Sequence, residues 1–402
     1  MSKLEQLINE LSPDGVEFDF LYTVMDYEQP TKYIVKDTKY DDDFETPVLT
    51  AGQSFILGYT NENTGIFEAS KENPVIIFDD FTTSFHWVDF DFKVKSSAMK
   101  MLRLKNDRYH DANFRYIYHV MKNIQYTPVD HTRQWIEKYS RFKVPLPPLP
   151  IQEEIVKILD NFTELTAELT AELTARKQQY EYYASNMFPS IKDTTYEWIE
   201  LGDIATVTKL AGFEFSKYVT YSDDGEIIAL RGLNVKKGHL VLDDVKYIDN
   251  SNLCMLNRSK LTVGDMLFTY VGTVGQVALI DKNDKYYLAP NVALIRISDE
   301  RFLPKFMMYY FLTQKFRFEQ IDKLLQNSSM QNLPMGKIRK FKLPALCLND
   351  QQSIVDTLDR FDKLCNDISE GLPAEIEARQ KQYEYYRDKL LKFKKKEAAE
   401  DE

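Results

Sequence analysis

Hydrophobic side chains recur at alternating steps of four and three residues along the segment after Pro150. This spacing is typical of the a/d seam of a long helix that packs against another helix. The seam pauses near residue 170 and resumes towards Met187. Its members are Ile151, Ile155, Ile158, Phe162, Leu165, Leu169, Tyr180, Tyr183 and Met187.

A second seam of the same kind lies near the end of the chain. It is interrupted at Gly371-Leu372-Pro373, where a proline suits the first turn of a restarted helix. An a/d seam needs a second helix to pack against, and the sequence contains only these two seams. We therefore predict that the two long helices form an antiparallel pair. The members of the second seam are Ile354, Leu358, Phe361, then Cys365 or Leu364, followed by Ile368, Ile376, Tyr383, Tyr386 and Leu390.

The two helical segments belong to a long internal repeat. Phe142-Lys143-Val144-Pro145 recurs as Phe341-Lys342-Leu343-Pro344, and the ending Gln179-Tyr180-Glu181-Tyr182-Tyr183 recurs as Gln382-Tyr383-Glu384-Tyr385-Tyr386. The period is too long for a solenoid. It indicates two half-molecules, each a globular domain followed by a long helix. Two similar sites related by a pseudo-two-fold axis suit few ligands, and double-stranded DNA is one of them.

The segments before the helices are strand-rich. Short β-branched and aromatic runs alternate with turn residues at 46–50 and 74–78, and again at 227–230, 265–270, 277–280 and 292–297. In each half one helix is expected after the strands, near 114–121 and 304–313. The fold class is therefore α+β. The expected boundaries are a first domain at 1–144, a first helix at 145–190, a second domain at 191–343, a second helix at 344–396 and an acidic tail at 397–402.

The net charge of −11 would argue against DNA if it were evenly spread. However, residues 201–342 hold 20 Lys and Arg against 15 Asp and Glu, and residues 93–143 hold 12 against 4. Local basic faces matter more for phosphate contact than the total charge. The alternative, that these lysines only keep the protein in solution, stays open on charge alone.

Catalytic chemistry has no visible carrier in the sequence. We find no phosphate-binding glycine loop, no Cys or His pairs at metal-ligand spacing and no clustered histidines. We therefore expect a chain without catalytic residues, metal or cofactor. Three scattered cysteines, no apolar run long enough for a membrane and no signal peptide indicate a cytoplasmic protein.

Taken together, these features resemble the specificity subunit of type I restriction–modification systems, over nearly the full length. The motifs that carry the resemblance are Pro145-Leu146-Pro147-Pro148-Leu149-Pro150, Leu343-Pro344-Ala345-Leu346, the two Gln-Tyr-Glu-Tyr-Tyr endings, the tandem Thr166-Ala167-Glu168-Leu169-Thr170-Ala171-Glu172-Leu173, Val271-Gly272-Thr273-Val274-Gly275 and the amide-rich run 326–333.

The resemblance implies two target-recognition domains that each read half of a bipartite site in double-stranded DNA. It also implies that the long spacer helices bind two methyltransferase (modification) subunits, that restriction/translocase subunits join, and that S-adenosylmethionine belongs to those partners. The first domain is not obviously similar to the second, so base contacts cannot be transferred between them. An alternative is a coiled-coil adaptor with two peptide- or glycan-binding heads, whose binding need not weaken with salt as phosphate contacts do.

Candidate DNA contacts are polar or basic residues in loops and turns, together with glycines that let the backbone approach a phosphate or a base edge. Turn formation and helix capping would also explain this composition. In the first domain the candidates are Thr82, Thr83, Ser84, His86, Lys93, Lys95, Ser96, Ser97 and Lys100. In the second they are Tyr270, Gly272, Thr273, Gly275, Gln326, Asn327, Ser328, Gln331, Asn332, Lys337 and Arg339.

Aromatic and leucine side chains on the helices are candidates for docking partner subunits. An equally good interpretation is that they complete the core of the helix pair. These candidates are Leu165, Leu169, Leu173, Tyr180, Tyr183, Tyr383 and Tyr386.

The tandem at 166–173 predicts a spacing device. A third four-residue copy would add about 6 Å of helix and rotate the rest of the helix by only about 40°, so the seam stays aligned. Since DNA rises about 3.4 Å per base pair, we expect the unread gap between half-sites to grow by one base pair, or at most two. Methylome sequencing of the three-copy variant measures this gap.

The half-sites themselves should not change in that variant. If the tandem is only a good helix-forming filler, the gap stays as it is. A normal methylation level with an unaltered gap would therefore contradict the spacing role.

Overall fold

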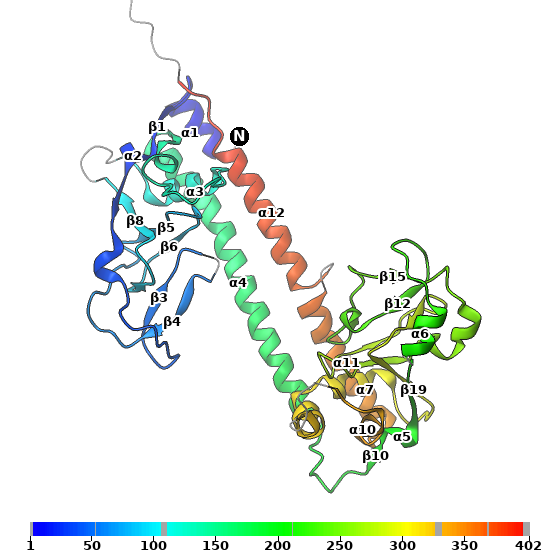
Figure 1. Cartoon of the computed structure of the whole chain (residues 1–402). Coiled ribbons are helices and arrows are strands. Elements are labelled where there is room, and N and C mark those ends of the chain that lie inside the picture. Colours follow the sequence, from blue (N-terminus) through cyan, green and yellow to red (C-terminus); the bar gives the residue numbers. More distant parts are fainter. Residues whose placement is uncertain are drawn as a thin grey trace, which may run out of the picture. The chain divides into compact units, whose positions relative to one another are not determined.

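The computed structural model describes residues 3–52, 54–105, 111–210, 212–325, 332–367 and 370–396. The chain divides into two compact units (Figure 1). Unit 1 comprises Met1–Glu168 and Ile376–Glu402, and unit 2 comprises Leu169–Glu375. Each unit therefore contains one globular domain together with parts of the long helices.

Unit 1 is built on a four-stranded antiparallel sheet in the order β2-β8-β5-β6 and a three-stranded sheet in the order β4-β3-β7, in which β3 and β7 run parallel. A separate pair, β1 with β9, joins the two ends of the domain. The strands are β1 (Glu17–Phe20), β2 (Met25–Glu28), β3 (Thr46–Leu49), β4 (Ile56–Thr60), β5 (Val75–Asp79), β6 (Phe85–Val88), β7 (Lys93–Val94), β8 (Met99–Leu104) and β9 (Lys143–Leu146). The helices of this domain are α1 (Lys3–Leu11), α2 (Leu21–Val24) and α3 (Phe114–Asn123).

Unit 2 repeats this plan. Its four-stranded sheet has the order β11-β19-β16-β17, its three-stranded sheet the order β15-β12-β18 with β12 and β18 parallel, and β10 pairs with β20. The strands are β10 (Trp198–Glu200), β11 (Ala205–Lys209), β12 (Ile228–Leu230), β13 (Val235–Lys236), β14 (His239–Leu240), β15 (Lys246–Tyr247), β16 (Met266–Thr269), β17 (Val277–Leu279), β18 (Tyr286–Leu288), β19 (Val292–Ile297) and β20 (Lys342–Pro344). The helices named here are α5 (Leu201–Ile204), α6 (Gly212–Tyr218), α7 (Pro304–Leu312) and α10 (Met335–Ile338).

The strand predictions are confirmed: the apolar runs form β3, β5, β12, β16, β17 and β19, and all of these except β17 lie inside their sheets. All residues of β16 are buried, as are all those of β5 except Asp79 at its end. Continuous apolar runs are expected for strands that are covered on both faces. The helices predicted near 114–121 and 304–313 are α3 and α7, and both pack their aromatic residues into the core of their own unit.

The long helices also agree with the prediction. Helix α4 (Leu149–Met187) is continuous over 39 residues, whereas the second segment is split into α11 (Leu348–Asn366) and α12 (Leu372–Leu390) at the predicted break. In unit 1, Phe162 of α4 stacks on Tyr386 of α12, with ring centroids 5.2 Å apart. In unit 2, Tyr183 of α4 contacts Phe361 of α11 at 5.6 Å. The direction of pairing is antiparallel, and the α+β class with an internal repeat is confirmed.

A buried glutamine fastens each domain to the start of its long helix. Gln152 accepts a hydrogen bond from the backbone N–H of Asn113 and donates to the carbonyls of Asp111 and Pro147. Gln351 does the same in unit 2 with Leu303, Arg301 and Leu346. Each amide thus satisfies three backbone groups at the loop before α3 or α7 and at the helix entry.

An aspartate about two turns further along each helix adds a second fastening. Asp160 accepts hydrogen bonds from Arg115 and His119 of α3, at 2.9 and 2.8 Å. Asp359 accepts from Lys305 and Tyr309 of α7, at 2.7 and 2.5 Å. The position of the carboxylate is the same in both units, although its partners have changed. The repeat therefore extends to the side chains that hold each domain on its helix.

Candidate nucleic-acid interface

In unit 2, residues 270–276 form the turn between β16 and β17, as the sequence predicted. The Thr269 hydroxyl accepts a hydrogen bond from the backbone N–H of Gln276 at 3.0 Å, which closes the turn. Gly272 and Thr273 are exposed, and Gly272 has a φ of +74° with open space where a side chain would stand. This glycine leaves the backbone accessible to a ligand.

The neighbouring glycine has a different role. A Cβ on Gly275 would lie 2.8 Å from the Ile321 side chain, so packing inside the unit explains this residue. Tyr270 is also buried, and burial raises the pKa of its hydroxyl. The prediction that Gly275 and Tyr270 face DNA is thus replaced by a structural role, because both are covered by protein.

A second segment lies against this turn. Val271 forms a bridge with Asn332, and the N–H of Leu333 donates to the Tyr270 carbonyl at 2.8 Å. Asn332, Lys337 and Arg339 are exposed, and one guanidinium nitrogen of Arg339 donates to the carbonyl of Val207 at 2.8 Å. The other candidates of this run, Gln326, Asn327, Ser328 and Gln331, lie outside the described residues.

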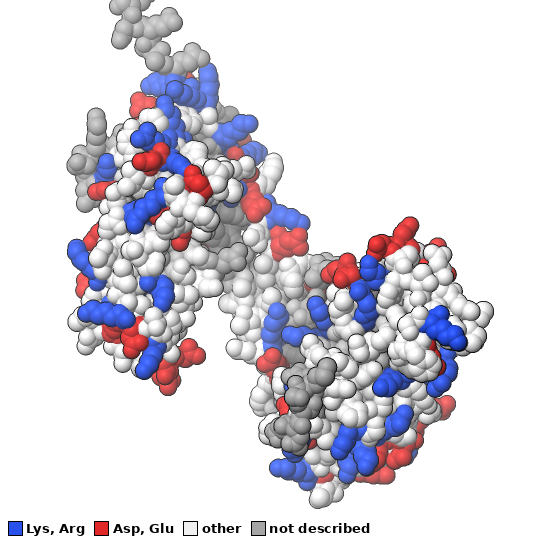
Figure 2. Space-filling model, viewed as in Figure 1, with Lys and Arg blue, Asp and Glu red and all other residues white. Residues whose placement is uncertain are grey.

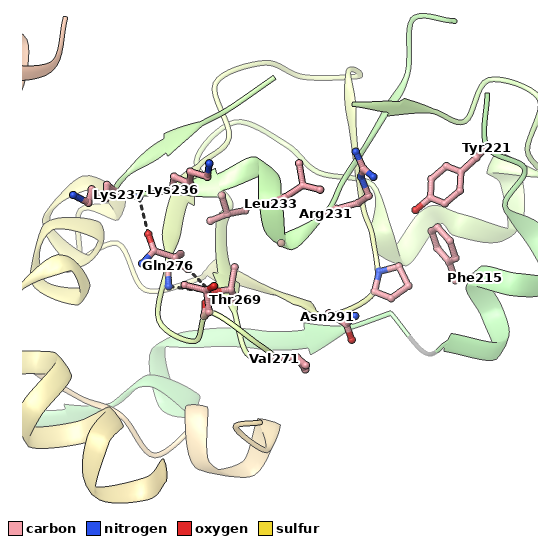
Figure 3. Close-up of a pocket in the computed structure, with 14 residues that line it drawn as sticks. Phe215, Tyr221, Arg231, Leu233, Lys236, Lys237, Thr269, Val271, Gln276 and Asn291 are labelled. Atoms are coloured by element: carbon pink, nitrogen blue, oxygen red, sulfur yellow. Dashed lines mark hydrogen bonds between the residues drawn. The ribbon is translucent and has the colours of Figure 1, made fainter. Parts of the chain in front are cut away.

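A pocket of about 740 Å³ opens beside the turn (Figure 3). The turn supplies Thr273 and Gln276, and the loop between β18 and β19 supplies Asn291, whose φ is +69°. The segment after β12 supplies the basic part of the wall, and Phe215 and Tyr221 supply an aromatic part. The polar lining residues that the sequence analysis missed include Arg231, Lys236, Lys237 and Asn291.

In unit 1, residues 80–84 form the turn between β5 and β6. Thr82 and Ser84 are exposed and their hydroxyls are hydrogen-bonded at 3.2 Å. Thr83 has a φ of +59° and is mostly buried. A β-branched residue is strained in this backbone region, and such strain gathers at functional sites. The strained backbone at Thr83 is a second indication, besides the residue types, that this turn belongs to a functional site.

The two predicted segments of unit 1 meet at this turn. The N–H of Asp80 donates to the Ala98 carbonyl at 2.8 Å, which brings the loop between β7 and β8 alongside. That loop exposes Lys95, Ser96 and Ser97. His86 is half-buried, its Nε2 lies 3.0 Å from the Gly52 carbonyl, and burial lowers its pKa. His86 therefore positions the neighbouring loop.

Two predicted phosphate contacts are incorrect. Lys93 is 1% exposed, and its ammonium donates to the carbonyls of Thr64 and Gly65 at 2.7 and 3.0 Å and pairs with Glu62. Lys100 is fully buried, with its Nζ 3.4 Å from Asp80. Both lysines lie in strands whose neighbouring residues are buried as well, so their charges are paired inside the domain and are not available to DNA.

The helical candidates divide into two kinds. Tyr180 and Tyr383 face inward: burial raises the pKa of each to about 12, and Tyr383 hydrogen-bonds His119 at 3.1 Å. Tyr183 and Tyr386 are partly exposed and form the inter-helix ring contacts. Leu165, Leu169 and Leu173 are half-buried along α4. The sequence analysis passed over the most exposed pair, Tyr182 and Tyr385, at 67% and 61%.

Basic and acidic side chains are interspersed on the visible face of both units (Figure 2). Among the described residues, no cluster of three His, Cys, Asp or Glu could hold a metal ion. In that same part of the chain, no helix has the length and apolar character needed to cross a membrane. The turns and the pocket are thus the distinctive polar features of the two domains.

The sequence matches the family described as Type I restriction modification DNA specificity domain, over residues 13–176 and again over 194–378. The chain belongs to the specificity subunits of type I restriction–modification systems. It is 40% identical to the specificity subunit of the Escherichia coli enzyme EcoR124I/EcoR124II, over 99% of both chains. It is 30% identical to a putative specificity subunit of Haemophilus influenzae, over 85% of this chain and 86% of that one.

Solved structures have the same fold at low identity. The S subunit from M. genitalium gives a TM-score of 0.56 at 11% identity and covers 94% of this chain and 96% of that one. A chain from a study of the assembly of the type I R-M system gives 0.58 at 14% identity, with 94% and 98% covered. The specificity subunit is thus a non-catalytic component that recognises a DNA sequence, and nothing supports the adaptor alternative.

Lys95 and Lys93 offer a matched test of the unit 1 interface. Lys95→Ala should leave stability unchanged and reduce the slope of log K against log salt for DNA binding by about 1, since one phosphate contact is lost. Lys93→Ala should instead lower the free energy of unfolding by about 3 kcal/mol, because Glu62 and two backbone carbonyls lose their buried partner. Salt titrations of binding and urea unfolding measure the two effects. A stable Lys93→Ala protein with the flatter slope would reverse the assignment.

Proposed function

We propose that this specificity subunit reads a bipartite DNA target, one half with each unit. The observation that carries the proposal is the equivalence of two turns. The β5–β6 turn of unit 1 and the β16–β17 turn of unit 2 occupy the same place in sheets of the same order. The sequence predicted DNA contacts at each turn on different grounds: short polar residues in unit 1 and a glycine-containing turn in unit 2.

The loops beside the two turns are equivalent as well. Asp80 donates its N–H to Ala98 in unit 1, and Tyr270 donates its N–H towards the Asn291 carbonyl at 3.5 Å in unit 2. In both units the loop that joins the parallel strand to the inner strand of the four-stranded sheet thus borders the turn. A shared frame with different side chains supports two readers of two different half-sites.

In this proposal the unit 1 contacts come from Thr82, Ser84, Lys95, Ser96 and Ser97. Those of unit 2 come from Gly272, Thr273, Asn332 and Lys337, with the amide-rich run 326–331 nearby in sequence. Short hydroxyl and amide side chains suit base edges, and the lysines suit phosphates. The bases between the half-sites are not read in this proposal.

The proposed partners are two methyltransferase (modification) subunits in the cytoplasm, joined by restriction/translocase subunits. Support comes from a duplicated aromatic ladder on the helices. In unit 2 it runs from Phe361 through Tyr183 to the exposed Tyr182, and in unit 1 from Phe162 through Tyr386 to Tyr385. The same surface present twice suits two copies of one partner.

Exchange of one domain tests the two-reader proposal. Replacing residues 1–144 with the first domain of another specificity subunit should change one half of the methylated motif and leave the other half and the gap intact. Methylome sequencing of cells that carry the hybrid with its modification subunit provides the measurement. If both halves change together, the two domains do not read independently.

The aromatic ladders predict the stoichiometry of assembly. Tyr182→Ala and Tyr385→Ala should each remove one of two bound modification subunits, because exposed tyrosines are frequent anchors of interfaces. The double variant should bind neither. Mass measurement of the purified complex counts the copies, and Tyr196→Ala, which removes an exposed tyrosine away from the ladders, is the control. Two bound copies in the double variant would exclude this surface.

A further inference from the structure

We infer that Arg231 is a specificity-determining residue that reads a guanine in the half-site of unit 2. The inference rests on the proposed function, because it takes unit 2 as a reader of DNA. It assigns a base-reading role to the pocket beside the β16–β17 turn. Of the polar residues that line this pocket, only Thr273 was a candidate DNA contact in the sequence analysis.

Arg231 comes directly after the buried strand β12 and lines the pocket together with Asn291 (Figure 3). Thr273 is a further lining residue. Its Nη2 donates to Asp244 twice, to the Oδ1 at 2.7 Å and to the backbone carbonyl at 2.9 Å. One nitrogen of the guanidinium is therefore fixed by the protein before any ligand arrives.

A buried asparagine fixes the loop that carries both residues. Asn234 is fully buried. Its Oδ1 accepts from the Arg231 N–H at 3.0 Å, and its Nδ2 donates to the carbonyls of Val241 and Asp244, each at 2.8 Å. Asn234 thus sets the position of Arg231 and Asp244 together. Such preorganisation lowers the entropy cost of binding and sharpens geometric selection.

The guanidinium keeps donor capacity that Asp244 does not use. An arginine has five N–H donors, and the buried Nε of Arg231 has no hydrogen-bond partner among the described residues. The side chain as a whole is 24% exposed, so part of it reaches the pocket. Nη2 is held by Asp244 and Nε is buried, so the two N–H groups of Nη1 are the donors that can meet a ligand in the pocket. Guanine presents two acceptors, O6 and N7, along its major-groove edge, whereas adenine presents a donor beside N7.

The charge balance favours a base edge over a phosphate. Asp244 neutralises Arg231 and would repel a phosphate at the same place, whereas a neutral base edge only needs the directed N–H groups. Lys236 is exposed on the pocket wall without such a carboxylate and is the better phosphate contact. Phe215 and Tyr221, with ring centroids 5.2 Å apart, add an apolar wall. Partial exclusion of water makes an unmatched hydrogen bond more costly.

The test is selection of bound sequences from a randomised duplex library by the full chain with its modification subunits. The wild type should select a guanine at one position of the unit 2 half-site. Arg231→Ala should lose discrimination at that position alone, by about 5- to 150-fold. Arg231→Lys should not restore it, since a flexible ammonium cannot reproduce the planar, oriented donors of the guanidinium. Asp244→Asn should weaken the same discrimination, because the guanidinium loses its orienting carboxylate.

Arg301→Ala is the matched control. Asp299 holds Arg301 as Asp244 holds Arg231, at 2.7 Å, but Arg301 does not line the pocket, so the selected motif should not change. If Arg231→Ala and Arg231→Lys keep the full motif, or lose affinity equally for all sequences, Arg231 does not read a base. If the wild type itself selects no bipartite motif, the proposed function fails, and the inference fails with it.

Discussion

The attachment of each domain to its long helix is the constraint on which the rest of the structure depends. Gln152 and Gln351 each satisfy three backbone groups from inside the protein. A buried amide that loses these partners would leave several polar groups unsatisfied, each at a cost of about 1–3 kcal/mol. The domain is therefore held in one orientation on the helix within its unit.

Within unit 1 the turn between β5 and β6, the proposed reading turn, is fixed by a buried aspartate. Asp80 donates its N–H to Ala98, accepts from the N–H groups of Gln134 and Trp135, and faces Lys100. A single residue thus joins the turn, the neighbouring loop and the segment before β9. In unit 2, Tyr270 has the equivalent place and Asn234 organises the pocket wall. The two domains reach the same layout with different polar anchors, which explains why their sequences diverged while their sheets did not.

The charge of the chain is used in two ways. Lys93 and Lys100 are buried inside unit 1, where acidic side chains pair with their charges, whereas Lys95 in the adjoining loop is exposed. The excess of basic residues in 93–143 therefore overstates the charge that can reach DNA. In the proposed function, DNA recognition depends on a few directed side chains at the turns and in the pocket rather than on a broad basic surface.

The sequence by itself determined the repeat, the long helices with their break at Gly371, the strand order along the chain and the family. These features depend on local periodicity and turn chemistry, which neighbouring residues carry. Tertiary structure alone decided which candidates reach the surface: Lys93 meets Thr64 and Glu62, Gly275 meets Ile321, and Arg231 meets Asp244. These contacts join residues that are not neighbours in the sequence, so a local sequence pattern cannot predict them. The exposed tyrosines were visible in the repeat, but only packing separated Tyr182 and Tyr385 from their inward neighbours.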